Sequence, residues 1–486
     1  MEMSLYNILL TVILVVDCIF IIAVIFLERK NPASTMAWVL VFMFLPGIGA
    51  LIYLLVGSGF KVNKQKRYAM KSITDAVSDN LVCGYLNLND IIKFYENNHD
   101  YTRIAACLRN DGSIYTLYNQ AEIFTDGNSM FERMLDDMRQ ASSHIHLLYY
   151  IFRNDNLGKR IISLLEEKAR SGVEVRVLYD SFGSMLGFST MFKKLIQAGG
   201  KVYAFEPLLL HLSPYFRLNY RNHRKITVVD GKIAYVGGMN IGDEYMGQDK
   251  KLKPWRDTGL RITGQAAWFL QSRFLLDFSY SSDEKDPFQR LNKFFPDPDP
   301  RQAGALGIQI ASSGPDQASE KPIKSGMLEM LYSARRNIYI QTPYFTPDES
   351  FLEAIRIAIR SGVDVRLMVP GVSDNPLAQN ATLSYCRDVF KMGCKVYLYN
   401  GFLHAKAVVI DGAVASIGST NIGTRSFALN FEVNAFVYDN AFASQYEDIF
   451  HEDAASSLKL DQTWFDERNL PTRLAYSIAR LFSPLM

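Results

Sequence analysis

The feature that most restricts the fold is an internal repeat in the larger, C-terminal part of the chain. Three stretches of the first half recur in the second half in the same order. IHLLYYIF (145–152) parallels IYIQTPYF (338–345), SGVEVRVLYD (171–180) parallels SGVDVRLMVP (361–370), and HRKITVVDGKIAYVGGMN (223–240) parallels HAKAVVIDGAVASIGSTN (404–421). Self-similarity of this kind indicates two copies of one structural unit.

Within each half, short apolar runs alternate with amphipathic, helix-like stretches such as 157–169 and 351–360. This alternation is typical of α/β folds. We therefore predict two similar α/β repeats, each with a central mixed sheet flanked by helices, packed face to face. An Asp-Gly pair (230–231 and 411–412) separates two apolar runs in each half, which predicts a β-hairpin. The preceding His and Lys then lie on one face at the mouth of a strand.

The third repeated stretch contains polar residues at matched offsets, in the pattern HxKx4D followed by GGxN or GSxN. A single HxK would be weak evidence, whereas a recurrence at identical offsets is very improbable by chance. The candidate catalytic residues are His223, Lys225, Asp230, His404, Lys406 and Asp411. The candidate phosphate-binding residues are Asn240, Ser419 and Asn421.

This set of side chains suits a phosphodiester exchange that needs no metal ion and no cofactor. Two lysines would neutralise the phosphate oxygens. One imidazole would attack phosphorus, while the other protonates the leaving alcohol and later accepts a proton from the incoming one. Each imidazole then needs a carboxylate to orient it, and Asp257 (PWRDTG) and Glu432 (LNFE) follow the two motifs. Asp230 and Asp411, at hairpin tips, are expected to support the turns.

The paired HxKx4D motifs resemble those of the phospholipase D superfamily. Similarity to bacterial cardiolipin synthases extends over nearly the whole chain, in ERKNPASTMAWVLVFMFLPGIGALIYLLVG, TPYFTPD, FLHAKAVVID, GSTNIGTRSFALNFE and FSPLM. The resemblance implies phospholipase D-type repeats and a phosphohistidine intermediate. It also implies transfer of a phosphatidyl group between two phosphatidylglycerol molecules, with release of glycerol. By similarity, His223 is the nucleophile and His404 the acid and base. One asymmetry, Gly238 against Ser419, suggests that only one half supplies a hydroxyl near the phosphate.

The N-terminus carries two apolar runs. Leu5 to Leu27 has about the 20 apolar residues that a membrane-crossing helix requires, and no Lys or Arg precedes it, so we expect a retained anchor rather than a cleaved leader. The second run, 36–56, is interrupted by Pro46 and Gly47; it is either a kinked span, which we favour, or a re-entrant segment. For Asp17, in the first run, a polar contact within the hairpin or a dimer is favoured over a catalytic role.

Basic residues after the second run outnumber those between the runs, Arg29 and Lys30. The positive-inside rule then leaves the catalytic part in the cytoplasm, attached to the bacterial cell membrane by a multi-pass anchor. The expected organisation is a membrane hairpin of two transmembrane helices (1–60), a connector (61–110), a first repeat (111–285), a linker (286–305) and a second repeat with an amphipathic tail (306–486).

Composition excludes some alternatives. The net charge of +2 gives no general attraction to nucleic acid, which argues against a nuclease, and five scattered cysteines suggest neither disulfides nor a zinc site. A hydrolytic phospholipase D stays open, because acceptor choice depends on how well water is excluded. A non-catalytic scaffold is disfavoured by intact motifs in both halves. The partners implied are two phosphatidylglycerol molecules and the bilayer, and a homo-oligomer is left open.

Two apolar segments leave alternatives. The stretch 205–220, just before His223, is either a lip that dips into the membrane or a buried connection. The C-terminal stretch TRLAYSIARLFSPLM is either amphipathic on the membrane or docked on the core.

Overall fold

The computed structural model describes residues 5–27, 32–56, 101–184, 188–205, 220–282, 291–296, 304–315 and 321–483. The chain divides into two compact units. One comprises residues 1–69 and 209–220, and the other comprises residues 70–208 and 221–486. The expected lip lies almost wholly outside the described residues, as do most of the connector and of the linker between the repeats.

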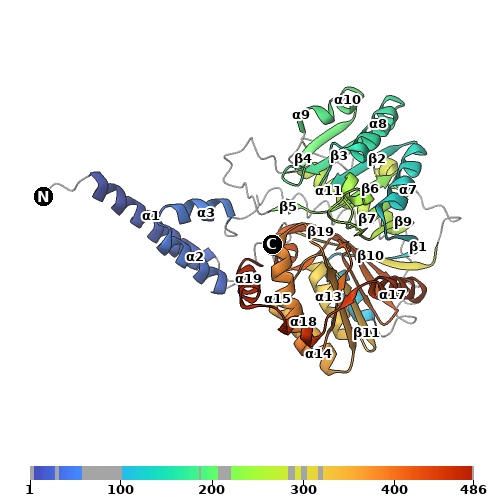
Figure 1. The fold of residues 1–486 in the computed structure, drawn as a ribbon. Coiled ribbons are helices and arrows are strands. Elements are labelled where there is room, and N and C mark those ends of the chain that lie inside the picture. The colour runs from blue at the N-terminus through green and yellow to red at the C-terminus, as the bar shows by residue number, and fades with distance from the viewer. Residues whose placement is uncertain are drawn as a thin grey trace. The chain divides into compact units, whose positions relative to one another are not determined.

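The N-terminal unit consists of three apolar helices (Figure 1): α1 (Leu5–Leu27), α2 (Pro32–Phe44) and α3 (Ile48–Val56). Among the described residues, only Asn7–Phe26 forms a helix that is long and apolar enough to cross a membrane. The second apolar run, for which a kinked span was favoured and a re-entrant segment left open, is interrupted at Leu45–Gly47, because proline cannot continue a helix. The polar contact expected within the hairpin is present, because the Gly47 amide donates to Asp17 Oδ2 at 2.8 Å.

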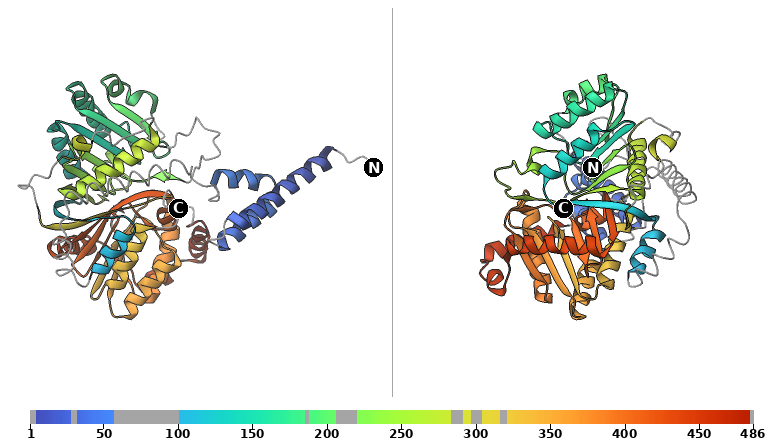
Figure 2. Two further views of the ribbon diagram at one scale, coloured as in Figure 1. Left: turned by 180° about the vertical axis from the view of Figure 1, so that it is seen from behind. Right: turned by 90° about the vertical axis from the view of Figure 1, so that its right-hand side faces the viewer.

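The larger unit contains the two repeats, coloured green and orange in Figures 1 and 2. The strands of the first are β1 (Tyr115–Phe124), β2 (His144–Tyr149), β3 (Glu174–Asp180), β4 (Lys201–Phe205), β5 (Arg221–Asn222), β6 (Ile226–Val229), β7 (Ile233–Gly237), β8 (Trp255–Arg256) and β9 (Gly259–Thr263). Its helices are α7 (Gly127–Arg139), α8 (Asn156–Arg170), α9 (Phe188–Met191), α10 (Lys193–Gln197) and α11 (Gln265–Ser281). The short helices α6 (Thr102–Asn110) and α12 (Leu291–Phe294) lie outside the repeat boundaries.

The second repeat follows the same plan. Its strands are β10 (Leu306–Ser313), β11 (Asn337–Gln341), β12 (Phe345–Thr346), β13 (Asp364–Pro370), β14 (Lys395–Tyr399), β15 (Phe402–Leu403), β16 (Ala407–Ile410), β17 (Val414–Gly418), β18 (Ile422–Gly423), β19 (Asn430–Tyr438) and β20 (Leu458–Lys459). Its helices are α13 (Pro322–Ser333), α14 (Glu349–Arg360), α15 (Pro376–Met392), α16 (Thr424–Ala428), α17 (Asn440–Ala455), α18 (Gln462–Asp466) and α19 (Leu470–Leu481).

The mixed sheet expected for each repeat is present. In the first repeat β2 pairs parallel with β3 and antiparallel with β6, and in the second β11 pairs parallel with β13 and antiparallel with β16. The two sheets do not simply face each other, however. They join edge to edge through antiparallel pairing of β1 with β10, so that one continuous sheet runs through both repeats. The repeats are therefore parts of one body.

Local sequence explains the helices that flank this sheet. Helix α8 begins where Asp155 accepts a hydrogen bond from the Gly158 amide, and α14 begins where Asp348 accepts one from Phe351, which satisfies otherwise free N–H groups. The apolar side chains of each helix recur on one face and are buried against the sheet. Helix α6 belongs to the segment expected to be a connector, but it is part of the packed structure: its Ile104 and Leu108 are buried in the core of the second repeat.

Candidate active site

Two short strand pairs bring the two motifs together. Strand β5, just before His223, pairs parallel with the start of β19, and β15, just before His404, pairs parallel with β8. The His223 amide donates to the Phe431 carbonyl at 2.9 Å, and the His404 amide donates to the Arg256 carbonyl at 2.6 Å. Each histidine is thereby fixed next to a backbone segment of the other repeat.

The two carboxylates predicted to orient the imidazoles lie in these segments, and they cross between the repeats. His223 Nδ1 is 3.0 Å from both Glu432 oxygens, and His404 Nδ1 is 2.6 Å from Asp257 Oδ2. Because a carboxylate only accepts, each Nδ1 carries the proton and donates it. Each Nε2 is then left with a lone pair that faces the site.

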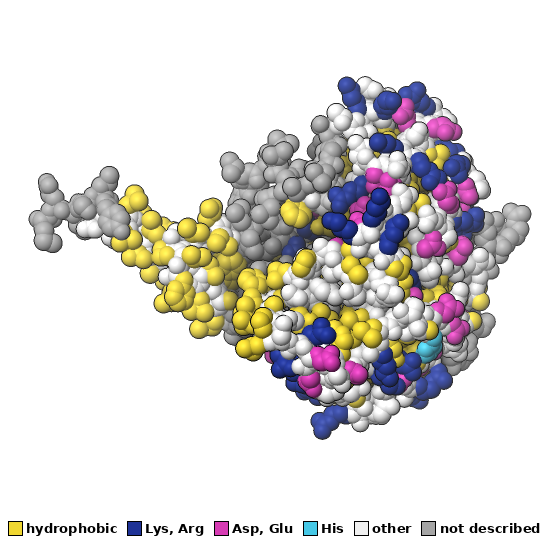
Figure 3. Space-filling view, in the orientation of Figure 1, with side chains coloured by type: hydrophobic (Ala, Val, Ile, Leu, Met, Phe, Trp, Pro, Cys, Tyr) yellow, Lys and Arg dark blue, Asp and Glu magenta, His cyan; other side chains and the backbone are white. Residues whose placement is uncertain are grey.

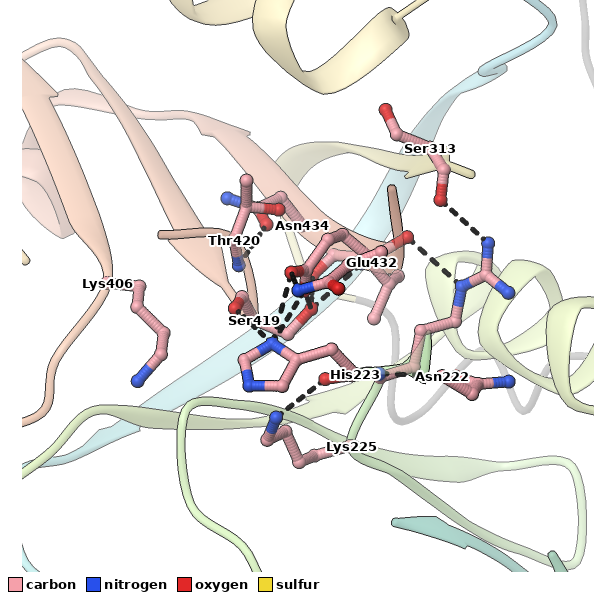
Figure 4. Close-up of polar contacts among 12 residues, drawn as sticks. Asn222, His223, Lys225, Ser313, Lys406, Ser419, Thr420, Glu432 and Asn434 are labelled. Carbon is pink, nitrogen blue, oxygen red and sulfur yellow. Dashed lines mark hydrogen bonds and ion pairs between the residues drawn. The ribbon is translucent and has the colours of Figure 1, made fainter. Parts of the chain in front are cut away.

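Both lysines of the motifs are buried beside these histidines. The Lys225 ammonium donates to the His223 carbonyl at 2.6 Å, and the Lys406 ammonium donates to the His404 carbonyl. In Figure 4 both ammonium groups lie on the Nε2 side of His223, away from Glu432. Burial lowers the pKa of Lys406 to about 8, although Asp257 and Glu432 act in the opposite direction. Burial lowers the pKa of Lys225 well below its usual value, and an anion bound between the two lysines would favour their charged forms.

Burial also lowers the pKa of both imidazoles. For His223 the pKa falls to about 4, because burial and the lysines outweigh the effect of Glu432. For His404, burial lowers the pKa most and Lys406 lowers it further, whereas Asp257 raises it. Burial would raise the pKa of Glu432, yet His223, Lys225 and Ser419 together hold it below its ordinary range. The free site therefore holds two neutral imidazoles and an ionised Glu432 at neutral pH.

The motif aspartates lie at the other end of the strands from the histidines. Asp230 and Asp411 have φ of 53° and 54° at the tips of the β6–β7 and β16–β17 hairpins. Asp230 accepts from the amides of Ser142, Ser143 and His144 just before β2. Asp411 accepts equivalently from residues 335–337 just before β11. These carboxylates tie each hairpin to the neighbouring strand, as their predicted supporting role requires.

The predicted phosphate-binding residues differ in what they contact. The Ser419 hydroxyl donates to Glu432 Oε2 at 2.5 Å (Figure 4), so it supports the carboxylate that holds His223. Gly238, its counterpart, is close to Asp257, and a Cβ there would overlap Asp257 Oδ1. The side-chain amide of Asn240 accepts a hydrogen bond from the Ile151 N–H and donates one to the Tyr245 hydroxyl. By contrast, Asn421 Oδ1 is buried and makes no hydrogen bond among the described residues.

Several residues at the site were not singled out from the sequence. Arg224, between His223 and Lys225, is fully buried and donates to the Glu432 carbonyl at 3.0 Å and to Asp277 at 2.7 Å. It thereby fixes the backbone that carries Glu432. The Tyr150 ring lies 5.0 Å from the His223 ring, and Trp255 lies 5.7 Å from the His404 ring. No signal in the sequence indicated Arg224, because the second motif has alanine at the equivalent position and the repeat therefore does not mark this residue.

No three His, Cys, Asp or Glu side chains in the described ranges are grouped so as to hold a metal ion.

Comparisons with known proteins concern the sequence and the fold. The family model described as "Cardiolipin synthase, PLD-like domain" matches residues 134–252 and 327–454, and a phospholipase D-nuclease N-terminal model matches residues 9–58. The cardiolipin synthase of Oceanobacillus iheyensis is 40% identical, and the major cardiolipin synthase of Bacillus subtilis is 41% identical; each comparison covers 100% of both chains. Phosphatidylserine synthase of Haemophilus influenzae shares the fold, with a TM-score of 0.61 at 15% identity over 79% of this chain and 99% of that one.

Proposed function

The chain belongs to the cardiolipin synthases of the phospholipase D superfamily, and we propose that it joins two phosphatidylglycerol molecules into cardiolipin and glycerol. The enzyme is a phosphatidyltransferase that acts on phospholipids. The choice of catalytic residues rests on two hydrogen bonds between the repeats, His223 with Glu432 and His404 with Asp257. They leave two Nε2 atoms and two lysines to act on one phosphodiester.

In the first half-reaction, His223 Nε2 attacks the phosphorus of one phosphatidylglycerol. The P–Nε2 bond forms as the P–O bond to glycerol breaks, and protonated His404 gives its Nε2 proton to the departing glycerol oxygen. Glu432 stabilises the positive charge that develops on His223. Lys225 and Lys406 neutralise the phosphate oxygens, and Asn421 adds a polar contact.

In the second half-reaction, neutral His404 accepts the proton of a glycerol hydroxyl on another phosphatidylglycerol. That oxygen attacks phosphorus, the P–Nε2 bond breaks, and His223 returns to its neutral form. The cycle thus restores both histidines. His404 needs a proton to begin it, although burial and Lys406 lower its pKa in the free site. The negative charge of the bound phosphodiester offsets that effect of the lysine and raises the pKa of His404 when substrate is present.

The remaining motif residues act indirectly. Asp230 and Asp411 fix the hairpins that carry the lysines and histidines, and Ser419 holds Glu432 in place. Asn240 orients the β2–α8 loop through the Ile151 amide. None of these needs to touch phosphorus for the reaction to proceed.

The protein is membrane-associated, and we place its catalytic part on the cytoplasmic side because the basic residues after α3 follow the positive-inside rule. The tail helix α19 adds a second apolar surface. Its exposed large apolar side chains lie within about 120° of one another around a helix of 3.6 residues per turn. They are Leu470, Leu474, Ile478, Leu481 and Phe482.

The opposite face of α19 packs on the protein, since Ala479 is buried and Arg480 pairs with Asp388 of α15. The chain just after the helix contacts α16, which precedes the strand that carries Glu432: the Thr424 hydroxyl donates to the Ser483 carbonyl. Figure 3 shows hydrophobic side chains gathered in this region and over the N-terminal helices. We propose that the exposed stripe of α19 contacts the bilayer beside the site.

The decisive experiment supplies detergent-purified protein with phosphatidylglycerol labelled in its headgroup and acyl chains. The expected products are cardiolipin and free glycerol. Phosphatidic acid in place of cardiolipin would show that water is the acceptor, and would favour a hydrolytic phospholipase D. No turnover of this lipid would contradict the proposal.

A further inference from the structure

The second apolar run of the N-terminal unit reverses direction inside its own length. Helices α2 and α3 contain 13 and 9 residues, whereas about 20 are needed to cross a bilayer. They are separated by Leu45, Pro46 and Gly47, and Gly47 has a φ of 76°. Glycine adopts that left-handed conformation without the penalty that a side chain would impose.

The packing of Tyr53 shows which way α3 runs after the break. Its ring lies 4.9 Å from Trp38 and 5.7 Å from Phe42, both on α2. A helix that continued in the direction of α2 would carry Tyr53 about 22 Å away from Trp38. Helix α3 therefore folds back beside α2 (Figure 1), and the two form a helical hairpin.

The tip of this hairpin lies at the middle of α1. The Gly47 amide, released by the helix break, donates to Asp17 Oδ2 at 2.8 Å, and Asp17 is only 4% exposed. Asp17 is about 15 Å along the helix from Leu27, which is half of a hydrocarbon core about 30 Å thick. A backbone amide at that depth needs a protein acceptor because the lipid offers none.

The charges of the flanking segments favour the same arrangement. If α2 and α3 turn back at mid-depth, the segment after α1 and the segment after α3 lie on one face of the membrane. All nearby basic residues then share that face: Arg29, Lys30, Lys61, Lys64, Lys66, Arg67 and Lys71. The stretch Met1–Asn7, on the other face, has none. Two complete crossings would also leave the larger group of basic residues inside, but they would place Arg29 and Lys30 on the opposite face.

We propose that the anchor crosses the membrane once, through α1, and that α2 and α3 form a re-entrant hairpin in the cytoplasmic leaflet. The side chains at its tip are apolar and exposed, namely Met43, Phe44 and Ile48, and they contact the lipid tails. The amino-terminal end of α1 faces the outside. This topology is independent of the proposed reaction.

The test uses the full-length protein in intact spheroplasts. A protease-cleavable tag is fused before Met1, and in separate proteins Asn31→Cys and Ser58→Cys are probed with a membrane-impermeant maleimide. The expected result is that external protease removes the tag, while Asn31→Cys reacts only after permeabilisation. Ser58→Cys is the matched control, because both topologies place it inside. The unsubstituted protein gives the background from native cysteines.

Protection of the tag, or labelling of Asn31→Cys from outside, would overturn the proposal in favour of two crossings. Tag cleavage needs no cysteine substitution, so that arm remains valid if a variant misfolds. Cardiolipin formation by the same cells is measured in parallel. Loss of that activity with the expected labelling would count against the proposed reaction and leave the topology standing.

Discussion

At the scale of single residues, the two histidines differ in their surroundings, and the difference supports distinct roles. His223 is held by Glu432, which in turn accepts from Ser419, whereas His404 is held by Asp257 among aromatic rings. The nucleophile forms a covalent bond to phosphorus, whereas the acid and base only transfers protons. A substrate whose leaving group needs no proton separates these roles.

We therefore predict opposite behaviour of two variants with phosphatidyl-p-nitrophenol. His404→Ala should release about one equivalent of nitrophenolate per enzyme and then stall, because His404 is required to activate the acceptor. His223→Ala should show no burst. Stopped-flow absorbance measures the burst, and intact-protein mass spectrometry detects the phosphatidyl group on His223. A burst in His223→Ala alone would assign the roles the other way round.

The asymmetry between Gly238 and Ser419 gives a second prediction. Gly238→Ser should reduce kcat on the order of 10²-fold or more, because the new side chain would displace Asp257 from His404. Ser419→Gly should cost only about tenfold, since it removes one hydrogen bond to a charged group. Steady-state rates on phosphatidylglycerol measure both variants. Equal losses would mean that crowding at Asp257 is unimportant.

The recurrence of His, Lys and Asn at fixed offsets singled out the candidate reacting groups from the sequence. The crossing of Asp257 to His404 was not predictable. It depends on pairing between β8 and β15, two-residue strands that are far apart in the chain and carry no periodic signal. The hydrogen bond of Ser419 was likewise not predictable, because the motif does not show that its hydroxyl turns toward Glu432.

At the scale of elements, strand β2 buries two histidines that the catalytic site does not use. The rings of His144 and His146 lie 4.6 Å apart, and both contact Gln271 of α11. Burial lowers the pKa of His144 to about 4 and that of His146 well below its ordinary value. The folded protein thus keeps both neutral, whereas the unfolded chain binds protons below about pH 6.5.

This pair should make the protein sensitive to acid. Because the unfolded state binds more protons, stability is complete above about pH 6.5 and falls as the pH decreases toward about 4, by about 3 kcal/mol for His144. His144→Gln should flatten the decrease, since glutamine stays neutral throughout. Thermal unfolding midpoints in detergent across this range measure the slope. His451→Gln, at an exposed position on α17, is the control, and an equal effect of both variants would contradict the prediction.

Helix positions were largely predictable from periodicity, and the break in the second apolar run was indicated by Pro46 and Gly47. The reversal of α3 was not, because hydropathy reports how apolar a segment is and not where it turns. That direction depends on the packing of Tyr53 against Trp38 and on the Asp17 contact with Gly47. Both are tertiary interactions between residues distant in sequence.

At the scale of the whole molecule, the enzyme must hold a soluble-type α/β body at a lipid surface. Helix α1 supplies the tether, and insertion of such a helix is effectively irreversible. Tethering alone does not orient the body, whereas the substrate has to reach two buried histidines. The exposed stripe of α19, which ends beside Thr424 and Arg425, is suited to that second task.

We predict that Leu474→Glu combined with Leu481→Glu separates attachment from access. The double variant should stay in the membrane fraction, because α1 is intact, but its turnover of phosphatidylglycerol in vesicles should fall about tenfold, because two carboxylates oppose contact with an anionic bilayer. Its turnover of short-chain phosphatidylglycerol dispersed below the micellar concentration should be unchanged, since no bilayer has to be approached. Radiolabelled product formation measures both rates.

The control is Ile357→Glu, which places one carboxylate at an exposed apolar position on α14. It should leave both rates unchanged. Equal loss on vesicles and on dispersed lipid would show that the α19 variant is damaged in its chemistry, and full activity on vesicles would show that α19 does not contact the bilayer. Only a loss confined to vesicles fits a body that is tethered by one element and oriented by another.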